Sequence, residues 1–372
     1  MFRSARNTLK NLLRRKEAVP YSVEWYCEEE KKKGCSPAAA DMVARKFHHG
    51  KITQQEALSL TDYLCYCNNV NELRKRFSVS YKPDGTDFFV RMEPEDIIYG
   101  AMFGDIAGSI YEGKRVMECP PLNITDRNRM TDDSLLTLAT WEVLESGEKP
   151  GYFSRKIRTR DIKRESAYPI AHNPFTEAYR ETVMKYPHAG YGGNFYGWAT
   201  GDSSDPYGSL GNGSAMRVSP AGALLHDQKK VIEWAAISAM ATHNHVEGVK
   251  GAVVTAMCIW MAKKGYSKDQ VFQYMKYHYS YGTCLFKDFS FEEGRSIPDH
   301  QVECTFSVPA AVIAFHESTS YEDAIQKAIC IGRDTDTNAC ICGGIAAAYY
   351  GVSYCGNVKE TVEEKMKAQL IH

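Results

Sequence analysis

The stretch GRDTDTNACICGGIAAAYYG, residues 332–351, places two aspartates directly before a run of small apolar residues. The apolar run predicts a buried helix that begins near Thr337. Asp334 is of a residue type that caps helix N-termini. One cap would account for one of the carboxylates, Asp334 or Asp336, but not for both.

A second stretch, RMTDDSLLTLATWEVL at 129–144, repeats this arrangement, because Thr131, Asp132 and Asp133 precede another apolar helical run. Carboxylates and threonine hydroxyls are hard oxygen donors, which suit Mg²⁺, Mn²⁺ or Ca²⁺ rather than zinc. The two clusters lie 201 residues apart (334 minus 133). If they meet in space, two divalent ions roughly 3.5–4 Å apart would neutralise them. Two independent helix caps remain the structural alternative.

An EF-hand does not explain the C-terminal cluster, although Asp334, Asp336 and Asn338 imitate the start of its calcium loop. The sixth position of such a loop is glycine and the twelfth is glutamate. Here they are Ala339 and Ile345.

Composition narrows the class of protein. The 372 residues carry a net charge of -1, which does not predict a nucleic-acid-binding surface. Twelve cysteines without a CxxC motif indicate a reduced, cytoplasmic protein without disulfides. No apolar stretch approaches the ~18–20 residues that span a bilayer, so no transmembrane segment is expected.

The N-terminal part, residues 1–92, is expected to be a small helical extension. Residues 1–20 are basic and amphipathic, which fits either a frayed terminal helix or a helix that touches a membrane or an acidic partner. Cap signals predict helices over 36–50 and 53–64. The Pro-Asp-Gly turn in SVSYKPDGTDFFV (78–90) precedes a domain boundary placed near residue 92.

From residue 93 to 372 the helical period dominates and βαβ units are absent, so a mainly α-helical domain is predicted. Gly100, Gly104 and Gly108 recur every four residues, which puts them on one helix face and allows close helix packing. The Gly/Tyr/Asp/Pro-rich region between about 150 and 212 reads as a long connection. Connections of that length are usually functional.

Five segments in this order resemble the ADP-ribosylglycohydrolase family: GAMFGDIAGSIYEGKR (100–115), MTDDSLLTLA (130–139), GNGSAMRVSPAG (211–222), THNHVEGVKGA (242–252) and GRDTDTNACICGGIAAAYYG (332–351). The resemblance covers about residues 95–356. It implies an all-α, compact orthogonal multi-helix bundle. It also implies a binuclear Mg²⁺ centre, with Mn²⁺ possible, at the base of an ADP-ribose cleft.

The resemblance assigns site residues by position in the motifs. The implied metal ligands are Thr131, Asp132, Asp133, Asp334, Asp336 and Thr337. The implied catalytic residues are Glu112, Asp133 and Asp334. Arg333 departs from the family, which commonly has a second glycine there, and its side chain would either crowd the loop or reach towards a phosphate.

A further set is expected to bind the substrate: Tyr207, Ser209, Gly211, Asn212, Gly213, Met216 and His243. The glycines would permit positive φ and expose backbone N–H groups to a diphosphate. Tyr207 or Tyr191 would stack on adenine. Asp105 and Arg217 are interpreted as structural residues that orient the metal helix and the glycine loop, and His245 as a surface residue.

The expected activity is Mg²⁺-dependent removal of ADP-ribose from modified protein side chains by cleavage at C1″, with arginine-linked ADP-ribose favoured. Serine-linked ADP-ribose and O-acetyl-ADP-ribose are alternative substrates. A different class of function also stays open, in which residues 1–92 bind and block an ADP-ribosylating toxin. A nucleic-acid partner is not expected.

Overall fold

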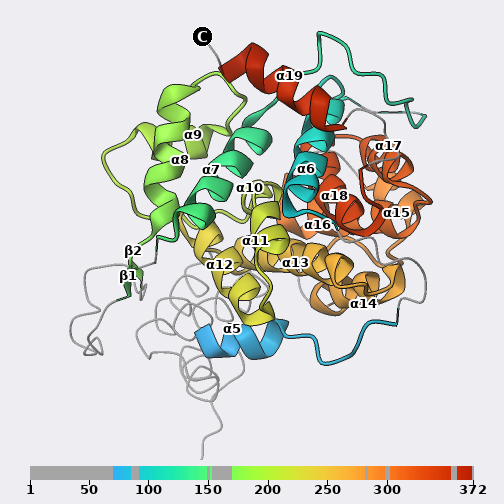
Figure 1. The fold of residues 1–372 in the computed structure, drawn as a ribbon, viewed down its shortest axis with the longest axis horizontal. Coiled ribbons are helices and arrows are strands. Elements are labelled where there is room, and N and C mark those ends of the chain that lie inside the picture. Colours follow the sequence, from blue (N-terminus) through green and yellow to red (C-terminus); the bar gives the residue numbers. More distant parts are fainter. Residues whose placement is uncertain are drawn as a thin grey trace, which may run out of the picture. The chain divides into compact units, whose positions relative to one another are not determined.

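The computed structural model describes residues 70–84, 92–114, 116, 118–148, 151–152, 170–280, 284–297, 302–352 and 358–370. They belong to one compact unit, formed by residues 70–153 and 170–372. This unit is helical, as the sequence predicts, apart from an antiparallel pair of short strands, β1 (Gly151–Tyr152) and β2 (Ile170–His172) (Figure 1).

The helices follow in chain order. They are α5 (Val70–Phe77), α6 (Pro94–Gly108), α7 (Asp132–Ser146), α8 (Pro174–Lys185), α9 (Gly193–Thr200), α10 (Gly213–Met216), α11 (Ser219–Leu224), α12 (Gln228–Met240), α13 (Val246–Lys263), α14 (Lys268–Tyr279), α15 (Phe291–Ser296), α16 (Cys304–His316), α17 (Tyr321–Ile331), α18 (Thr335–Tyr350) and α19 (Val358–Leu370).

Helices α6 and α18 pack along the glycine stripe. A Cβ atom on Gly104 would lie 2.0 Å from the carbonyl oxygen of Ala339, and one on Gly100 would lie 2.4 Å from Cβ of Ala347. A Cβ on Gly108 would lie 2.5 Å from the carbonyl oxygen of Thr335. The two backbones therefore approach each other as closely as the spacing of the glycines predicts. This contact sets the start of α18 beside the end of α6.

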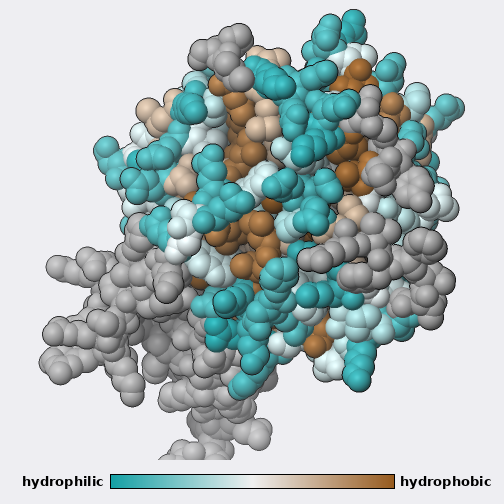
Figure 2. Space-filling model, viewed as in Figure 1, coloured by the Kyte–Doolittle hydropathy of each residue, from teal (hydrophilic) through white to brown (hydrophobic). Residues whose placement is uncertain are grey.

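The interior of the unit is apolar and the helices that cross it are buried on most sides. Helix α13 is buried from Val246 to Ala262, and α16 from Cys304 to Phe315. Figure 2 shows hydrophilic residues over most of the described surface on one face, with hydrophobic side chains visible between them near its middle. Helices of this kind form the rigid frame on which loops can be placed accurately.

Helix α18 begins at Thr335, two residues before the predicted position. Asp334 occupies the N-cap position but its carboxylate makes no capping hydrogen bond. The hydroxyl of Thr335 donates instead to the carbonyl oxygen of Gly108, at 2.9 Å. Because α6 anchors the helix start, the Asp334 carboxylate is left for other contacts.

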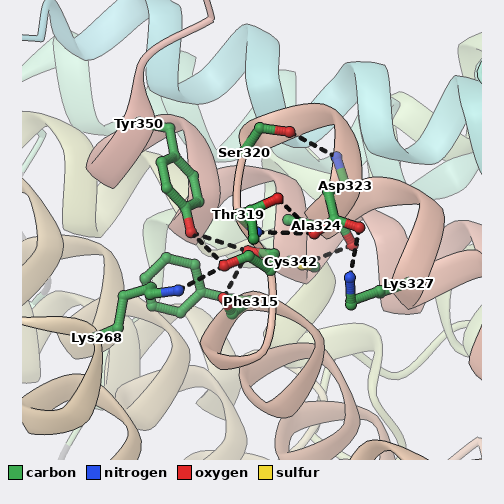
Figure 3. A network of polar contacts seen from close by, with 10 residues as sticks. Lys268, Phe315, Thr319, Ser320, Asp323, Ala324, Lys327, Cys342 and Tyr350 are labelled. Atoms are coloured by element: carbon green, nitrogen blue, oxygen red, sulfur yellow. Dashed lines mark hydrogen bonds and ion pairs between the residues drawn. The ribbon is translucent and has the colours of Figure 1, made fainter.

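The preceding helix, α17, is fixed at its N-terminus by a polar network (Figure 3). Ser320 caps α17 by accepting from the backbone N–H of Asp323. Lys268 of α14 and the hydroxyl of Tyr350 in α18 both donate to the carbonyl oxygen of Ser318. This network ties α14, α17 and α18 together. Helix α17 ends at Ile331, and Gly332 turns the chain with φ of 89° into the second aspartate cluster.

The prediction of a long connection between 150 and 212 is wrong, because helices α8 and α9 lie within it. Asn173 caps α8 and Pro174 takes its first position, a standard helix start. Phe175, Tyr179 and Val183, spaced by four residues, are fully buried. Irregular segments remain on either side of α9.

The predicted helices at 36–50 and 53–64 and the basic segment 1–20 lie outside the described residues. Residues 70–84 pack against the helical unit: Leu73 and Phe77 are buried, and the Tyr274 hydroxyl donates to the carbonyl oxygen of Phe77. The domain boundary near residue 92 stays a prediction. Among the described helices, none has the length and apolar character of a membrane span.

Candidate functional site

Both aspartate clusters line one cavity of about 780 Å³. The N-terminus of α7 contributes Asp132 and Asp133, and the loop before α18 together with its first turn contributes Asp334, Asp336 and Thr337. The glycine loop and the α9 region form other walls. Further lining residues are Glu112, Gly190, Gly192, Phe195, Tyr207, Ser209, Gly211, Asn212, Gly213, Met216, Arg217, His243 and Arg333.

Three buried carboxylates converge beside this cavity, and two of them, Asp133 and Asp336, line it. The side chains of Asp105, Asp133 and Asp336 each offer an oxygen atom, and these atoms lie within 4.8 Å of one another. Burial, followed by the charge of Asp336, raises the pKa of Asp133 well above its usual value. Burial and the charge of Asp334 raise the pKa of Asp336 in the same direction.

Asp105 anchors the start of α7. Its carboxylate accepts from the backbone N–H of Thr131 at 2.9 Å, from the Thr131 hydroxyl at 2.8 Å and from the backbone N–H of Ser134 at 3.1 Å. The Ser134 hydroxyl donates to it as well. Burial outweighs these bonds and raises the pKa of Asp105 to about 6. These contacts agree with the interpretation of Asp105 as a structural residue, because they orient helix α7, which begins at Asp132 and Asp133.

The composition of the cluster fits a divalent cation. None of the three carboxylates forms an ion pair with a described lysine, arginine or histidine. Oδ1 of Asp133 is buried without a hydrogen-bond partner. Uncompensated buried carboxylates are costly, and a hard cation bound by their oxygen atoms would remove the cost. Thr131, a predicted ligand, contacts Asp105 and does not line the cavity.

Asp334 connects the acidic cluster to the glycine loop, because its Oδ2 accepts from Nδ2 of Asn212 at 2.6 Å. Asn212 also donates to the hydroxyl of Ser307 at 2.9 Å. Asp132 is partly exposed, and burial of its carboxyl together with the charge of Asp105 raises its pKa to about 8. Five of the six predicted ligands, all except Thr131, thus line the cavity.

Glu112 lies at the rim, exposed, in the turn that follows α6. Partial desolvation and the charge of Asp334 raise its pKa, whereas Arg129 opposes the shift. The backbone next to Glu112 is paired with the loop before α18, since the N–H of Gly113 donates to the carbonyl oxygen of Arg333 at 2.8 Å. This pairing fixes Glu112 near the aspartates.

Arg333 adopts φ of 72°, which is uncommon for a residue other than glycine. Its Nη2 donates to the carbonyl oxygen of Ile297 at 3.0 Å. The two outcomes predicted for this side chain were crowding of the loop and reach towards a phosphate, and neither is observed. It extends to the end of α15 while Arg333 also lines the cavity.

The prediction of positive φ in the glycine loop is wrong, because Gly211 and Gly213 are not among the described residues with positive φ. A Cβ atom on Gly213 would instead lie 3.0 Å from Nε2 of His243, and one on Gly211 would lie 3.5 Å from the same atom. The imidazole therefore crowds a side chain at position 213 and would make an ordinary contact with one at position 211. The sequence gives no signal of this contact.

The remaining predicted residues divide into two groups. Tyr207 and His243 line the cavity with ring centroids 6.2 Å apart. Tyr191 does not line it and stacks on Phe195, a lining residue that sequence reasoning missed because α9 was read as a connection. His245, predicted to be on the surface, is half-buried and caps α13 by accepting from the N–H of Glu247.

Comparisons with known proteins identify the family. The family model described as ADP-ribosylglycohydrolase matches residues 95–367. ADP-ribosylhydrolase ARH3 of Gallus gallus is 25% identical over 310 residues, covering 68% of this chain and 83% of that protein. The putative ADP-ribosyl glycohydrolase L543 of Acanthamoeba polyphaga mimivirus is 24% identical, covering 70% of this chain and 88% of that protein.

A solved structure, an ADP-ribosylglycohydrolase-related protein complex, superposes with a TM-score of 0.55 at 20% identity, covering 75% of this chain and 97% of that one. This likeness shows the fold. The family match extends over most of the chain, and the chain therefore belongs to the ADP-ribosylglycohydrolase family. It is an enzyme of the ADP-ribosylhydrolase type.

Proposed function

We propose that this chain is a Mg²⁺-dependent hydrolase that removes ADP-ribose from modified protein side chains, with arginine-linked ADP-ribose as its favoured substrate. The observation that carries the proposal is the convergence of Asp133 and Asp336, which line a cavity large enough for a nucleotide ligand, with the buried carboxylate of Asp105 behind them. A binuclear centre, of Mg²⁺ or Mn²⁺, would be held by the cavity-lining carboxylates on α7 and before α18. Such ions would orient ribose hydroxyls and lower the pKa of bound water.

The reaction breaks the bond between C1″ and the leaving group and forms a bond between C1″ and a water oxygen. Positive charge grows on the sugar during this step, and the carboxylates beside the cavity favour it electrostatically. Glu112 is positioned at the rim to exchange a proton with water or with the leaving group. A raised pKa suits a carboxyl to that task.

The preference for an arginine linkage is supported by the charges at the rim. The charge of Asp334 raises the pKa of both Glu112 and Asp132, so these three acidic groups lie close together and the rim would attract a cationic guanidinium. Arg129 near Glu112 partly offsets this attraction. Comparing the hydrolysis rates of substrates with different ADP-ribose linkages tests whether the attraction outweighs the effect of Arg129.

The experiment is to incubate the protein with ADP-ribosyl-arginine, an ADP-ribosyl-serine peptide and O-acetyl-ADP-ribose in Mg²⁺, in Mn²⁺ and in EDTA. We expect release of ADP-ribose only with a metal, and fastest from the arginine linkage. Asp336→Asn should lower the rate about 10²-fold or more, because a ligand of the centre is lost. Asp126→Asn, at an exposed carboxylate, is the matched control. Intact substrates under all conditions would overturn the proposal.

Binding of a toxin or another protein by residues 1–92 is a separate proposal. A deletion of the whole extension would remove Leu73 and Phe77 from the helical unit, so loss of activity would be uninformative. Deletion of 1–69 avoids this. Unchanged hydrolysis together with loss of a protein partner would support a binding role, and an unchanged set of partners would refute it.

A further inference from the structure

Arg217 is buried at the cavity without a counter-ion. Its side chain is fully buried, and its guanidinium carbon lies 4.0 Å from the ring centroid of Tyr179 and 5.6 Å from that of Phe195. Its Nε and Nη1 have no hydrogen-bond partner, and no described carboxylate pairs with it. Burial of an unpaired guanidinium costs free energy, so a functional role for the Arg217 charge is expected.

The one nitrogen of Arg217 that is engaged leads to His243. Nη2 donates to Oγ1 of Thr242 at 2.9 Å, and that oxygen lies 2.7 Å from Nδ1 of His243. Nη2 also donates to the carbonyl oxygen of Ser238 at 3.3 Å. A guanidinium can only donate, so Thr242 accepts from Arg217 and keeps its own hydrogen for another acceptor. Among the described contacts of this hydroxyl, Nδ1 of His243 is that acceptor.

Electrostatics favours the same assignment. A positive guanidinium near Nδ1 is attracted to a lone pair on that nitrogen and repelled by an N–H. Burial and the charge of Arg217 also lower the pKa of His243 well below its usual value, so the ring is neutral. A neutral imidazole carries one hydrogen, which is therefore on Nε2.

Nε2 faces the glycine loop. It is the atom that a Cβ on Gly213 or Gly211 would approach, at 3.0 and 3.5 Å respectively. The backbone of His243 is fixed because its N–H donates to the carbonyl oxygen of Ala239 at 2.7 Å, and the ring is held at Nδ1 by the Thr242 hydroxyl. Its donor is thus aimed at the part of the cavity beside Gly213.

We propose that Arg217 and Thr242 are positioning residues that keep His243 in the Nε2–H tautomer, so that His243 donates a hydrogen bond to an anionic phosphate oxygen beside the glycine loop. The phosphate is one of the diphosphate of ADP-ribose, and in this respect the inference rests on the proposed function. In the opposite tautomer the Nε2 lone pair would face the phosphate oxygens and repel them.

The first test needs no variant. Two-dimensional ¹H–¹⁵N spectra of the protein labelled at histidine distinguish the protonated ring nitrogen from the unprotonated one, and comparison with His243→Gln assigns the signals. We expect Nε2 to carry the hydrogen in the wild type, without ligand and at neutral pH. A hydrogen on Nδ1 overturns the inference, whether or not the protein binds ADP-ribose.

The second test measures ADP-ribose affinity by calorimetry for the wild type, Thr242→Val and Thr242→Ser, in EDTA and in Mg²⁺. Thr242→Val removes the hydroxyl and should weaken binding about tenfold or more, since a hydrogen bond to a charged group is lost. Thr242→Ser keeps the hydroxyl and should bind within about twofold of the wild type. The loss should be the same with and without Mg²⁺.

The outcomes separate this inference from the proposed function. If the wild type fails to bind ADP-ribose, the proposed function fails, and the tautomer is still decided by the spectra. If the wild type binds and Thr242→Val binds equally well, only the positioning role of Arg217 and Thr242 is refuted. Equal losses in Thr242→Val and Thr242→Ser refute it too, because the hydroxyl would then not matter.

Discussion

Asp133→Asn should stabilise the protein when metal is absent, although the residue lies at the centre of the site. In EDTA the buried carboxyl of Asp133 faces Asp336, Asp105 and Asp132, and its Oδ1 has no partner. An isosteric amide removes one charge from this cluster. The same change removes a ligand oxygen, so the variant should lose its response to metal.

The magnitude follows from the ordinary pKa of 3.8 for an aspartate in the unfolded chain. At about 1.36 kcal/mol per pKa unit, the penalty for a carboxyl that is kept protonated at pH 7 has a ceiling of about 4 kcal/mol. We therefore expect Asp133→Asn to raise the free energy of unfolding in EDTA, by no more than this ceiling of about 4 kcal/mol.

The sign of the pH dependence gives a second readout. The folded protein keeps a proton on this carboxyl to a higher pH than the unfolded chain does, because its pKa is raised. Stability is therefore lost as pH rises above 3.8, and this loss should be shallower in Asp133→Asn. Below pH 3.8 the two proteins should converge.

Urea denaturation in EDTA and in Mg²⁺ is the assay. Mg²⁺ at 100 times its dissociation constant should stabilise the wild type by about 2.7 kcal/mol per ion and the variant much less. Asp126→Asn, at an exposed carboxylate, should change stability by less than about 0.5 kcal/mol in either buffer. The reasoning is refuted if Asp133→Asn is less stable than the wild type in EDTA, or if Mg²⁺ stabilises both equally.

Three further predictions concern other parts of the unit. Burial, with Arg76 and Lys250 nearby, lowers the pKa of His278 to about 3, so the stability of the folded protein should fall as pH drops below 6.5. In urea denaturation the wild type should lose about 2 kcal/mol more stability than His278→Gln from pH 7 to pH 5. Equal losses in the two proteins would contradict this. Gly213→Ala should weaken ADP-ribose binding in calorimetry because its Cβ would displace the His243 ring, whereas Gly197→Ala, with no atom within 4 Å of the added Cβ, should bind normally. Arg129→Gln should move one limb of the pH–rate profile to higher pH, since Arg129 lowers the pKa of Glu112: the acid limb if Glu112 is the base and the alkaline limb if it is the acid. A profile in which neither limb moves would remove Glu112 from the proton-transfer step.

Sequence predicted the parts of this structure that depend on local periodicity. The four-residue spacing of Gly100, Gly104 and Gly108 predicts one helix face without side chains, and α18 packs against that face of α6. The position of Thr131 before an apolar run predicts a capped helix, and Thr131 caps α7. Each of these features is decided within one or two turns of chain.

Features decided by contacts between distant segments were missed. Helix α18 starts at Thr335 because Thr335 bonds to Gly108 of another helix, so the capping preference of Asp334 did not set the boundary. The glycine content of the 150–212 region concealed α9. The crowding at position 213 comes from His243, 30 residues later in the chain (243 minus 213), which no local pattern reports.

The central claim is that the two aspartate clusters bind divalent ions together. Anomalous diffraction from crystals soaked in Mn²⁺ tests it most directly, because the ions are located without reference to activity. The account predicts two anomalous peaks in the cavity, in contact with carboxylate oxygens from both the α7 cluster and the α18 cluster. Peaks elsewhere on the protein, or none at saturating Mn²⁺, would contradict it.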